Sequence, residues 1–321
     1  MSKLILGIWD GHDSGAALLQ GDEIKCLINE ERLTRRKLEI AFPRRSIAAC
    51  LQFAGVRAAD ISLIAVCTTD PAKTLTRLFP SLKEEYYLIR RRKKMPRPLD
   101  PLRKSFKYRF TELSPNFIST KLSRAYLHRQ LQTLGFHNYD LHLIDHHQAH
   151  AEAAAGCCGF PDALVVTLDG VGDGLCGSMR VLKNGHLSLL RKFPAGSSPG
   201  IFFEHVTNLL NMRELEDEGK VMALANYAYP VPDAENPLLN VIQAKDGRII
   251  SIGSSTAQLK ALKKILWNYP SEQFSFMAQR ALEKTAVDLV DHYLQKTGLR
   301  HIAAAGGVFS NIKMNMALAE L

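Results

Sequence analysis

The stretch that decides the fold is Ala163-Leu-Val-Val-Thr-Leu-Asp-Gly-Val-Gly-Asp-Gly174, a buried-strand pattern that runs into a polar glycine turn. A second strand pattern follows over residues 178–183. Asn184-Gly185 is a strong hairpin signal, and residues 186–193 form a third strand pattern. The sequence therefore predicts an antiparallel three-strand unit with an Asp-Gly-rich first turn.

The start of the chain repeats this succession. An apolar strand pattern over residues 3–9 leads into the turn Asp10-Gly-His-Asp-Ser-Gly15, and two more strand patterns follow around Gly21-Asp22. A repeat of this kind indicates a duplicated α/β domain. We predict two lobes, residues 1–161 and 162–321, with both Asp-Gly turns directed at one metal-bound polyphosphate. A purely structural hairpin is the alternative for either turn alone.

Composition indicates a soluble globular protein. The 321 residues are 46% hydrophobic and 23% charged, and no apolar run is long enough to span a bilayer. The first residues form a strand pattern without a signal-peptide cleavage pattern. None of the six cysteines forms a Cys-x-x-Cys pair, which excludes a zinc ribbon and argues against a disulfide framework. We predict a cytoplasmic protein that is not attached to a membrane.

The net charge of +9 is concentrated in a basic insertion at about residues 73–118, centred on the run Arg90-Arg-Arg-Lys-Lys94. Such a run is compatible with nucleic acid or another anionic partner. It is also typical of a solvated insertion. The second interpretation is favoured because aromatic residues are not interleaved regularly with the charges.

A candidate metal site lies in Leu143-Ile-Asp-His-His-Gln-Ala-His-Ala-Glu152, where a strand pattern is followed by a predicted helix. Residues four apart share a helix face, so His146 and His150 can bind one ion. His147 points elsewhere and is expected to be a packing or supporting residue. A helix N-terminus with polar capping residues is the alternative interpretation.

Gly306-Gly307 follows a strand pattern and precedes a helix that opens at Ser310-Asn311. Glycines at that place bring backbone N–H groups and the helix dipole to an anion. The alternative is a sterically tight turn.

Six short motifs in this order resemble the carbamoyltransferase family that includes the NodU, CmcH and TobZ enzymes. The resemblance spans nearly the whole chain, and the basic insertion is its least characteristic part. The motifs are Asp10-Gly-His-Asp-Ser-Gly-Ala-Ala-Leu18, Glu30-Glu-Arg-Leu-Thr-Arg35, His146-His-Gln-Ala-His150, Leu168-Asp-Gly-Val-Gly-Asp-Gly174, Asp217-Glu-Gly-Lys-Val-Met-Ala-Leu-Ala225 and Gly306-Gly-Val-Phe-Ser-Asn311.

The resemblance implies a duplicated actin-like, ribonuclease-H-like ATPase fold and an O-carbamoyltransferase. Carbamoyl phosphate and ATP give carbamoyl adenylate on a YrdC-like domain, and the actin-like part transfers the carbamoyl group to a hydroxyl of a small molecule. His12 then corresponds to the catalytic histidine. His146 and His150 correspond to ligands of a divalent metal, with iron favoured over manganese or zinc. The implied nucleotide-binding residues are Asp10, Gly11, Asp169, Gly170, Gly172, Asp173, Gly174, Glu218, Lys220, Gly306, Gly307 and Asn311.

Family members are considerably longer than this chain. A third metal ligand, an aspartate, is expected downstream of Leu321, as is the YrdC-like domain, so the second lobe is expected to be incomplete. We therefore expect the chain to be a fragment, a split enzyme needing a partner chain, or a degenerate copy. Two rival functions remain: a TsaD-like enzyme acting on tRNA, and a non-catalytic nucleotide-binding subunit. The motifs around Glu30 and Glu218 favour the small-molecule branch and argue against nucleic acid. The acceptor is left open.

Overall fold

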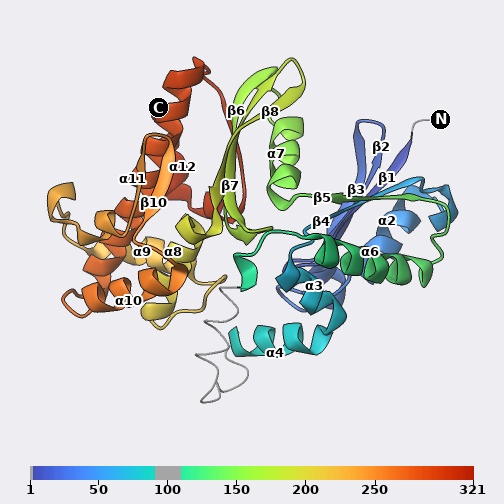
Figure 1. The fold of residues 1–321 in the computed structure, drawn as a ribbon, viewed down its shortest axis with the longest axis horizontal. Coiled ribbons are helices and arrows are strands. Elements are labelled where there is room, and N and C mark those ends of the chain that lie inside the picture. The colour runs from blue at the N-terminus through green and yellow to red at the C-terminus, as the bar shows by residue number, and fades with distance from the viewer. Residues whose placement is uncertain (1–2, 91–109) are drawn as a thin grey trace. The chain divides into compact units, whose positions relative to one another are not determined.

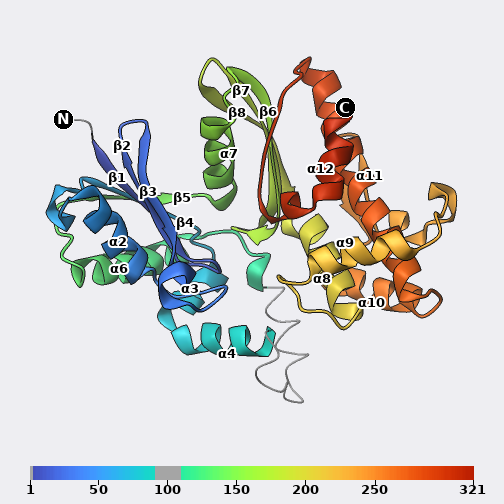
Figure 2. The same ribbon diagram turned by 180° about the vertical axis from the view of Figure 1, so that it is seen from behind.

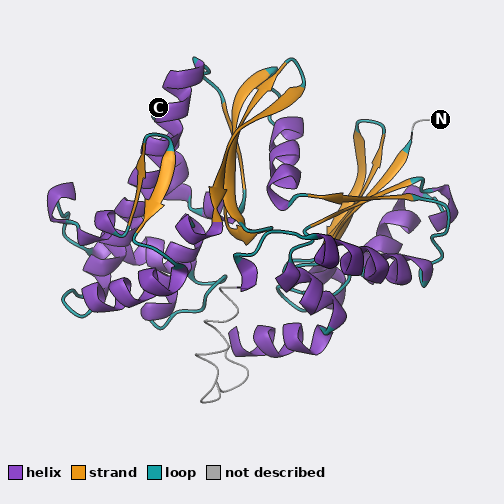
Figure 3. Cartoon of the chain, in the orientation of Figure 1, coloured by secondary structure: helices purple, strands orange, loops and turns teal. Residues whose placement is uncertain are grey.

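The computed structural model describes residues 3–90 and 110–321 (Figure 1). Its contacts divide the chain into two compact units. The first unit comprises the described part of residues 1–95 and residues 113–146, and the second comprises the described part of residues 96–112 and residues 147–321. Each unit combines its own sheet and its own buried core with surrounding helices (Figure 3).

A five-stranded mixed sheet in the order β3-β2-β1-β4-β5 forms the centre of the first unit. The β1–β2 and β2–β3 pairs are antiparallel, and the β1–β4 and β4–β5 pairs are parallel. Buried and half-buried side chains alternate along β1, as a period of two requires. The strands are β1 (Leu4–Trp9), β2 (Gly15–Gln20), β3 (Glu23–Asn29), β4 (Leu63–Cys67) and β5 (Asp140–Ile144).

Helices α2 and α6 supply most of the helical part of the first core, through Ile47, Cys50, Leu127 and Leu131. Helix α2 ends before Gly55, whose φ of 66° is the left-handed conformation that glycine adopts without strain. The helices are α1 (Glu30–Thr34), α2 (Arg44–Ala54), α3 (Pro71–Leu78), α4 (Pro80–Arg90) and α6 (Phe117–Gln132).

The second unit contains a four-stranded sheet in the order β11-β6-β7-β8 and a separate β9–β10 hairpin. The β6–β7 and β7–β8 pairs are antiparallel, whereas β11 pairs parallel with β6. The strands are β6 (Asp162–Gly172), β7 (Leu175–Lys183), β8 (His186–Pro194), β9 (Ile242–Lys245), β10 (Arg248–Ser251) and β11 (Ile302–Ala305).

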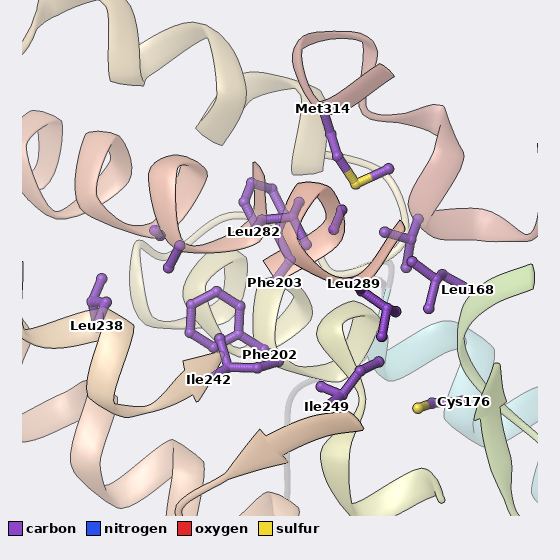
Figure 4. Close-up of a cluster of buried hydrophobic side chains, with 14 of the residues drawn as sticks. Leu168, Cys176, Phe202, Phe203, Leu238, Ile242, Ile249, Leu282, Leu289 and Met314 are labelled. Atoms are coloured by element: carbon purple, nitrogen blue, oxygen red, sulfur yellow. The ribbon is translucent and has the colours of Figure 1, made fainter. Parts of the chain in front are cut away.

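Successive residues of β6 face opposite sides of this sheet, and both sides are covered. Leu164 and Val166 belong to the main core, which helices α8, α11 and α12 complete (Figure 4). Ala163 and Val165 instead pack with Ala151 of α7. Helix α7 lies beside this sheet in both views (Figures 1 and 2). The near-continuous apolar run in β6 follows from this burial on two sides. The helices are α7 (His146–Cys157), α8 (Pro199–Leu209), α9 (Glu218–Leu224), α10 (Ser255–Leu266), α11 (Ser271–Thr297) and α12 (Ile312–Ala319).

The boundary between the units lies at His146/His147, and the predicted boundary at 161/162 is therefore displaced. The physical reason is the small-residue face of α7. Ala151 packs with Ala163 and Val165 of β6, and Ala154 and Ala155 contact the same cluster. Almost the whole of α7 thus belongs to the second unit.

The two sheets share one topology. Taking β6, β7, β8 and β11 as the counterparts of β1, β2, β3 and β4 reproduces the strand order and every pairing direction. This order is that of the ribonuclease-H-like sheet, and the predicted duplicated actin-like α/β fold is confirmed. Within residues 3–90 and 110–321, the sheet of the second unit has no counterpart of β5.

The centre of the basic insertion, including most of the run 90–94, lies outside the described residues. The described start of this segment forms α3 and α4. Among the helices that the structure describes, none has the length and apolar character required to traverse a bilayer.

Candidate functional site

Helix α7 begins directly after β5 and carries the two histidines predicted to bind a metal. His146 and His150 lie one turn apart, and the carboxylate of Asp169, in β6, joins them. One ligand atom from each residue lies within 4.8 Å of the other two. His150 Nε2 lies 3.1 Å from Asp169 Oδ2. Two ligands of one ion, each roughly 2.1 Å from it, are about 3 to 3.5 Å apart, so the distance between His150 Nε2 and Asp169 Oδ2 fits coordination of one ion.

The ring of His146 is held by Thr68, the residue directly after β4. Thr68 Oγ1 lies 3.0 Å from His146 Nδ1, and the His146 side chain is buried. An Nδ1–H that donates to a hydroxyl makes Nε2 the nitrogen with the lone pair, which is the usual arrangement for a metal-binding histidine.

His147 faces the sheet of the second unit, as predicted for a packing residue. Its Nδ1 lies 3.1 Å from Thr167 Oγ1, and its Nε2 lies 3.1 Å from the carbonyl oxygen of Leu175. The imidazole is completely buried and connects α7 to β6 and β7. Its two ring nitrogens are engaged in the fold.

His12 lies in the loop between β1 and β2, and it contacts Trp9 at the end of β1. The two rings are 6.1 Å apart between centroids, and the indole Nε1–H donates to the His12 carbonyl oxygen at 2.6 Å. Asp13 Oδ2 lies 3.1 Å from His12 Nδ1. A Cβ at Gly11 would lie 1.9 Å from the indole, so only glycine permits this loop to close over Trp9. The Trp9 ring also lies 5.6 Å from that of His146, which brings the two predicted functional histidines of the first unit together around one indole.

Asp10 is buried beneath this loop and surrounded by cations. Lys73 Nζ lies 2.7 Å from Asp10 Oδ1, and Arg77 forms a bidentate pair with the carboxylate at 2.9 and 3.0 Å. Lys83 Nζ donates to the Asp10 carbonyl oxygen. Although burial alone would raise it, the pKa of Asp10 is held well below its usual range by Lys73 and Arg77. The Asp10 carboxylate thus has internal partners, and its predicted contact with nucleotide stays a prediction.

The same contacts correct the interpretation of the basic segment as wholly solvated. Lys73 and Arg77 are buried, and Lys83 is half-buried. Burial and the neighbouring Lys73 lower the pKa of Lys83 to about 6. A cluster of three cations around one carboxylate favours loss of a proton from one lysine, because the remaining positive charges repel each other less.

A second group of predicted residues meets at the end of β6. Asp169 Oδ1 accepts from the backbone N–H of Gly170 at 2.7 Å and from that of Gly307 at 3.3 Å. Gly306 has a φ of 108°, and a Cβ there would lie 2.2 Å from the Leu168 carbonyl oxygen. Ser198, which caps α8, donates through Oγ to the carbonyl oxygens of Asp169 and Gly170 at 2.9 and 2.6 Å. Glycine at position 306 thus permits a close approach between β6 and the chain after β11, and contact of these residues with nucleotide stays a prediction.

Asp173-Gly174 is a two-residue hairpin turn. The φ values of 52° and 78° are both positive, and Gly172 pairs with Leu175 across the turn. The structural-hairpin interpretation accounts for these residues, and their contact with nucleotide stays a prediction.

The remaining predicted nucleotide-binding residues make local contacts. Glu218 Oε1 accepts from the backbone N–H of Leu215 at 2.7 Å, and Lys220 Nζ lies 2.9 Å from Asp217 Oδ1. Asn311 caps α12 and exchanges hydrogen bonds with Gln279 at 2.8 and 2.9 Å. The Lys220 side chain is exposed and can reach a ligand, while Asn311 is fixed by its cap.

With this geometry in view, the family can be assigned. The sequence model of the family described as Carbamoyltransferase N-terminus matches residues 4–321. The chain belongs to the carbamoyltransferase family.

Individual relatives are similar to the chain over most of its length. The chain is 29% identical over 314 residues to nodulation protein NolNO of Sinorhizobium fredii, covering 95% of this chain and 42% of that protein. It is 26% identical over 331 residues to the uncharacterized protein MJ1051 of Methanocaldococcus jannaschii, covering 99% and 53%. The chain thus spans about half the length of the curated relatives it matches. Among solved structures, component A of (R)-2-hydroxyglutaryl-CoA dehydratase from Acidaminococcus fermentans is 14% identical, with a TM-score of 0.48 over 99% of this chain and 88% of that chain.

Several residues at the candidate site of this carbamoyltransferase chain were not predicted from the sequence in the place where they lie. Asp169 was assigned to nucleotide, but it is the carboxylate that lies with His146 and His150. Trp9, Thr68 and Arg77 were not singled out. The parallel pairing of β4 with β1 and β5 was the signal that could have found Trp9 and Thr68, because the carboxyl ends of such strands meet at one edge of the sheet.

Proposed function

We propose that this chain carries the transfer site of an O-carbamoyltransferase, which moves a carbamoyl group from carbamoyl adenylate to a hydroxyl of a small-molecule acceptor. The observation that carries the proposal is the position of Trp9, whose ring contacts both His12 and His146. A proton acceptor and a metal ligand thereby flank one indole. Membership of the carbamoyltransferase family supports the reaction class.

The transfer step assigns one role to His12. The acceptor oxygen attacks the carbamoyl carbon, the bond from that carbon to the adenylate phosphate oxygen breaks, and AMP departs. The hydroxyl proton passes to His12 at Nε2, because Asp13 engages Nδ1 at 3.1 Å. A carboxylate on the other ring nitrogen orients the base and stabilises the imidazolium that forms.

His146, His150 and Asp169 would hold a divalent ion with two nitrogen donors and one oxygen donor. This donor set suits iron, manganese or zinc, and we favour iron. When bound, the ion supplies a Lewis acid that polarises a carbamoyl or phosphate oxygen.

The nucleotide would be bound by the close-packed backbones of Gly170, Gly306 and Gly307. A Cβ at Gly307 would lie 2.9 Å from Asp169 Oδ1, so a larger residue there would displace the Asp169 carboxylate. Carbamoyl adenylate would come from carbamoyl phosphate and ATP on a YrdC-like domain or a partner chain. The contacts of Lys73, Arg77 and Lys83 with Asp10 support a small-molecule acceptor over tRNA, since these basic side chains are already engaged within the first unit.

The test supplies the chain with a YrdC-like enzyme, ATP and carbonyl-labelled carbamoyl phosphate, together with a panel of sugar, chitooligosaccharide, cephem and polyketide alcohols. We expect label on at least one acceptor and its loss in His12→Asn. His186→Asn, which changes an exposed histidine on β8, is the matched control and should retain transfer. Label on tRNA alone would instead support the TsaD-like function, and nucleotide binding without any transfer would support a non-catalytic subunit.

A further inference from the structure

We propose that Thr68 and Arg77 are positioning residues for His146: Arg77 holds Thr68 in a left-handed backbone conformation, and the Thr68 hydroxyl then fixes the His146 tautomer that can bind a metal. This inference rests on the proposed metal-dependent function and concerns residues of the first unit only. It connects Asp10 and its surrounding cations to His146, the proposed metal ligand. The proposed transfer step does not by itself link these residues.

The backbone of Thr68 is the first observation. Its φ is 69°, and a β-branched residue is a genuine outlier in that region. Such a conformation persists only where the surroundings enforce it, and it is found most often at functional sites. Here it allows the Thr68 backbone N–H to donate to the Ile144 carbonyl oxygen at 3.1 Å while the hydroxyl lies 3.0 Å from His146 Nδ1.

Arg77 supplies the enforcement. Its Nη1 donates to the Thr68 carbonyl oxygen at 2.8 Å and to Ser123 Oγ at 2.9 Å. Its Nη2 donates to the Cys67 carbonyl oxygen at 3.3 Å as well as to Asp10, and Nε donates to Asp10. A guanidinium has five N–H donors, and all of them are used. The Arg77 guanidinium therefore links Asp10, which follows β1, to the carbonyl oxygens of Cys67 and Thr68 at the end of β4.

The hydroxyl determines which ring nitrogen is available to a metal. In the proposed arrangement Nδ1–H donates to Thr68 Oγ1, and the lone pair of neutral His146 then lies on Nε2. Loss of that acceptor removes this constraint on the tautomer. Partners of this kind typically contribute about 10- to 100-fold to metal affinity.

The test uses the metal-free full chain and its Co²⁺ complex. Thr68→Val removes the hydroxyl and keeps the β-branched shape, whereas Thr68→Ser keeps the hydroxyl. We expect Thr68→Val to weaken Co²⁺ binding about 10- to 100-fold in a chelator competition, and Thr68→Ser to restore most of it. Thr76→Val is the matched control, since the Thr76 hydroxyl donates to the carbonyl oxygen of Lys73 at 2.9 Å. ¹⁵N spectra of the metal-free protein should show a single His146 tautomer in the wild type and a mixture in Thr68→Val.

Arg77→Lys tests the second step, because lysine cannot reproduce the bidentate fork. We expect the same tautomer mixture and a similar loss of Co²⁺ affinity, with circular dichroism checking that the variant folds. If Arg77→Lys fails to fold, the Thr68 variants alone decide the question.

The outcomes separate the two proposals. Wild-type protein that binds no Co²⁺, or binding unaffected by His150→Ala, would overturn the metal site itself. Wild-type binding that Thr68→Val leaves unchanged, together with an unchanged tautomer, would overturn the positioning role and leave the metal site standing.

Discussion

The buried carboxylate of Glu30 accepts hydrogen bonds from both the backbone N–H and the hydroxyl of Ser46, each at 2.7 Å. Its other oxygen accepts from the backbone N–H of Arg45 at 3.0 Å. Glu30 begins α1 directly after β3, so its side chain satisfies the free N–H groups at the start of α2 and adds a negative charge at the positive end of that helix.

Glu30→Gln should therefore destabilise the first unit by about 1–3 kcal/mol, because an amide NH₂ would face N–H donors that a carboxylate oxygen now accepts. Urea unfolding would measure the free energy of unfolding. Glu23→Gln, at an exposed position of β3, should change it by less than about 0.5 kcal/mol. Equal effects of the two substitutions would contradict this role of Glu30.

The lysines around Asp10 predict a dependence of stability on pH. Between the folded pKa of Lys83, about 6, and its ordinary value of 10.5, the unfolded chain binds a proton that the folded chain does not. Stability should therefore be highest near the upper end of this window and decrease as the pH falls toward 6. The lowered pKa of Lys73 acts in the same direction.

Lys83→Met should flatten this profile, which unfolding measurements at several pH values between 7 and 9.5 would detect. Lys263→Met, at an exposed position of α10, should leave the slope unchanged. A slope in Lys83→Met as steep as that of the wild type would rule out the depressed lysine as its cause.

Alanine substitutions at two glycines of the second unit should change its stability in opposite directions. Gly306→Ala should destabilise the unit by more than about 2 kcal/mol, because its Cβ would lie 2.2 Å from a backbone carbonyl oxygen at a φ of 108°. Gly156→Ala lies in α7 with no atom near the added methyl group, and it should stabilise by about 0.5–1 kcal/mol. Thermal unfolding of both variants checks the pair. A tolerated alanine at 306 would show that this turn is not closely packed.

The carboxylate of Asp169 predicts a selective loss of metal. Asp169→Asn keeps Oδ1, which accepts from Gly170 and Gly307, but replaces the oxygen that faces His150. The fold should persist while metal affinity falls at least about tenfold, measured by elemental analysis and chelator competition. Asp173→Asn is the matched control in the hairpin turn, where asparagine tolerates a positive φ, and it should retain the metal. Full occupancy in Asp169→Asn would remove Asp169 from the ligand set.

Local patterns were sufficient for most elements of the fold. The strands that flank Gly21-Asp22 and Asn184-Gly185 are confirmed because two-residue turns and alternating burial are local properties of the sequence. The unit boundary was not predictable in this way. The sequence of an alanine-rich helix such as α7 is compatible with packing on either unit. Its packing on Ala163 and Val165 assigns it to the second unit.

The candidate site likewise combines features that local sequence predicts with contacts that depend on packing. The one-turn spacing of His146 and His150 is visible in the sequence, whereas their approach to Asp169 depends on how α7 packs on β6. The partners of Asp10 could not be anticipated, because Lys73 and Arg77 come from a distant segment whose charges are typical of a solvated surface. Long-range pairing of buried charges leaves no local pattern.

The burial of Asp10 has a consequence for how related chains can vary. The cations around Asp10 come from the segment that carries the fewest family motifs. A deletion in that segment that removed α3 would leave the buried Asp10 carboxylate without Lys73 and Arg77, the two cations that pair with it. Among relatives, replacement of Arg77 should accompany replacement of Asp10 or the arrival of another cation. Positions 10 and 77 should therefore change together among relatives. This holds even though Asp10 lies in a family motif and Arg77 lies in a segment without one.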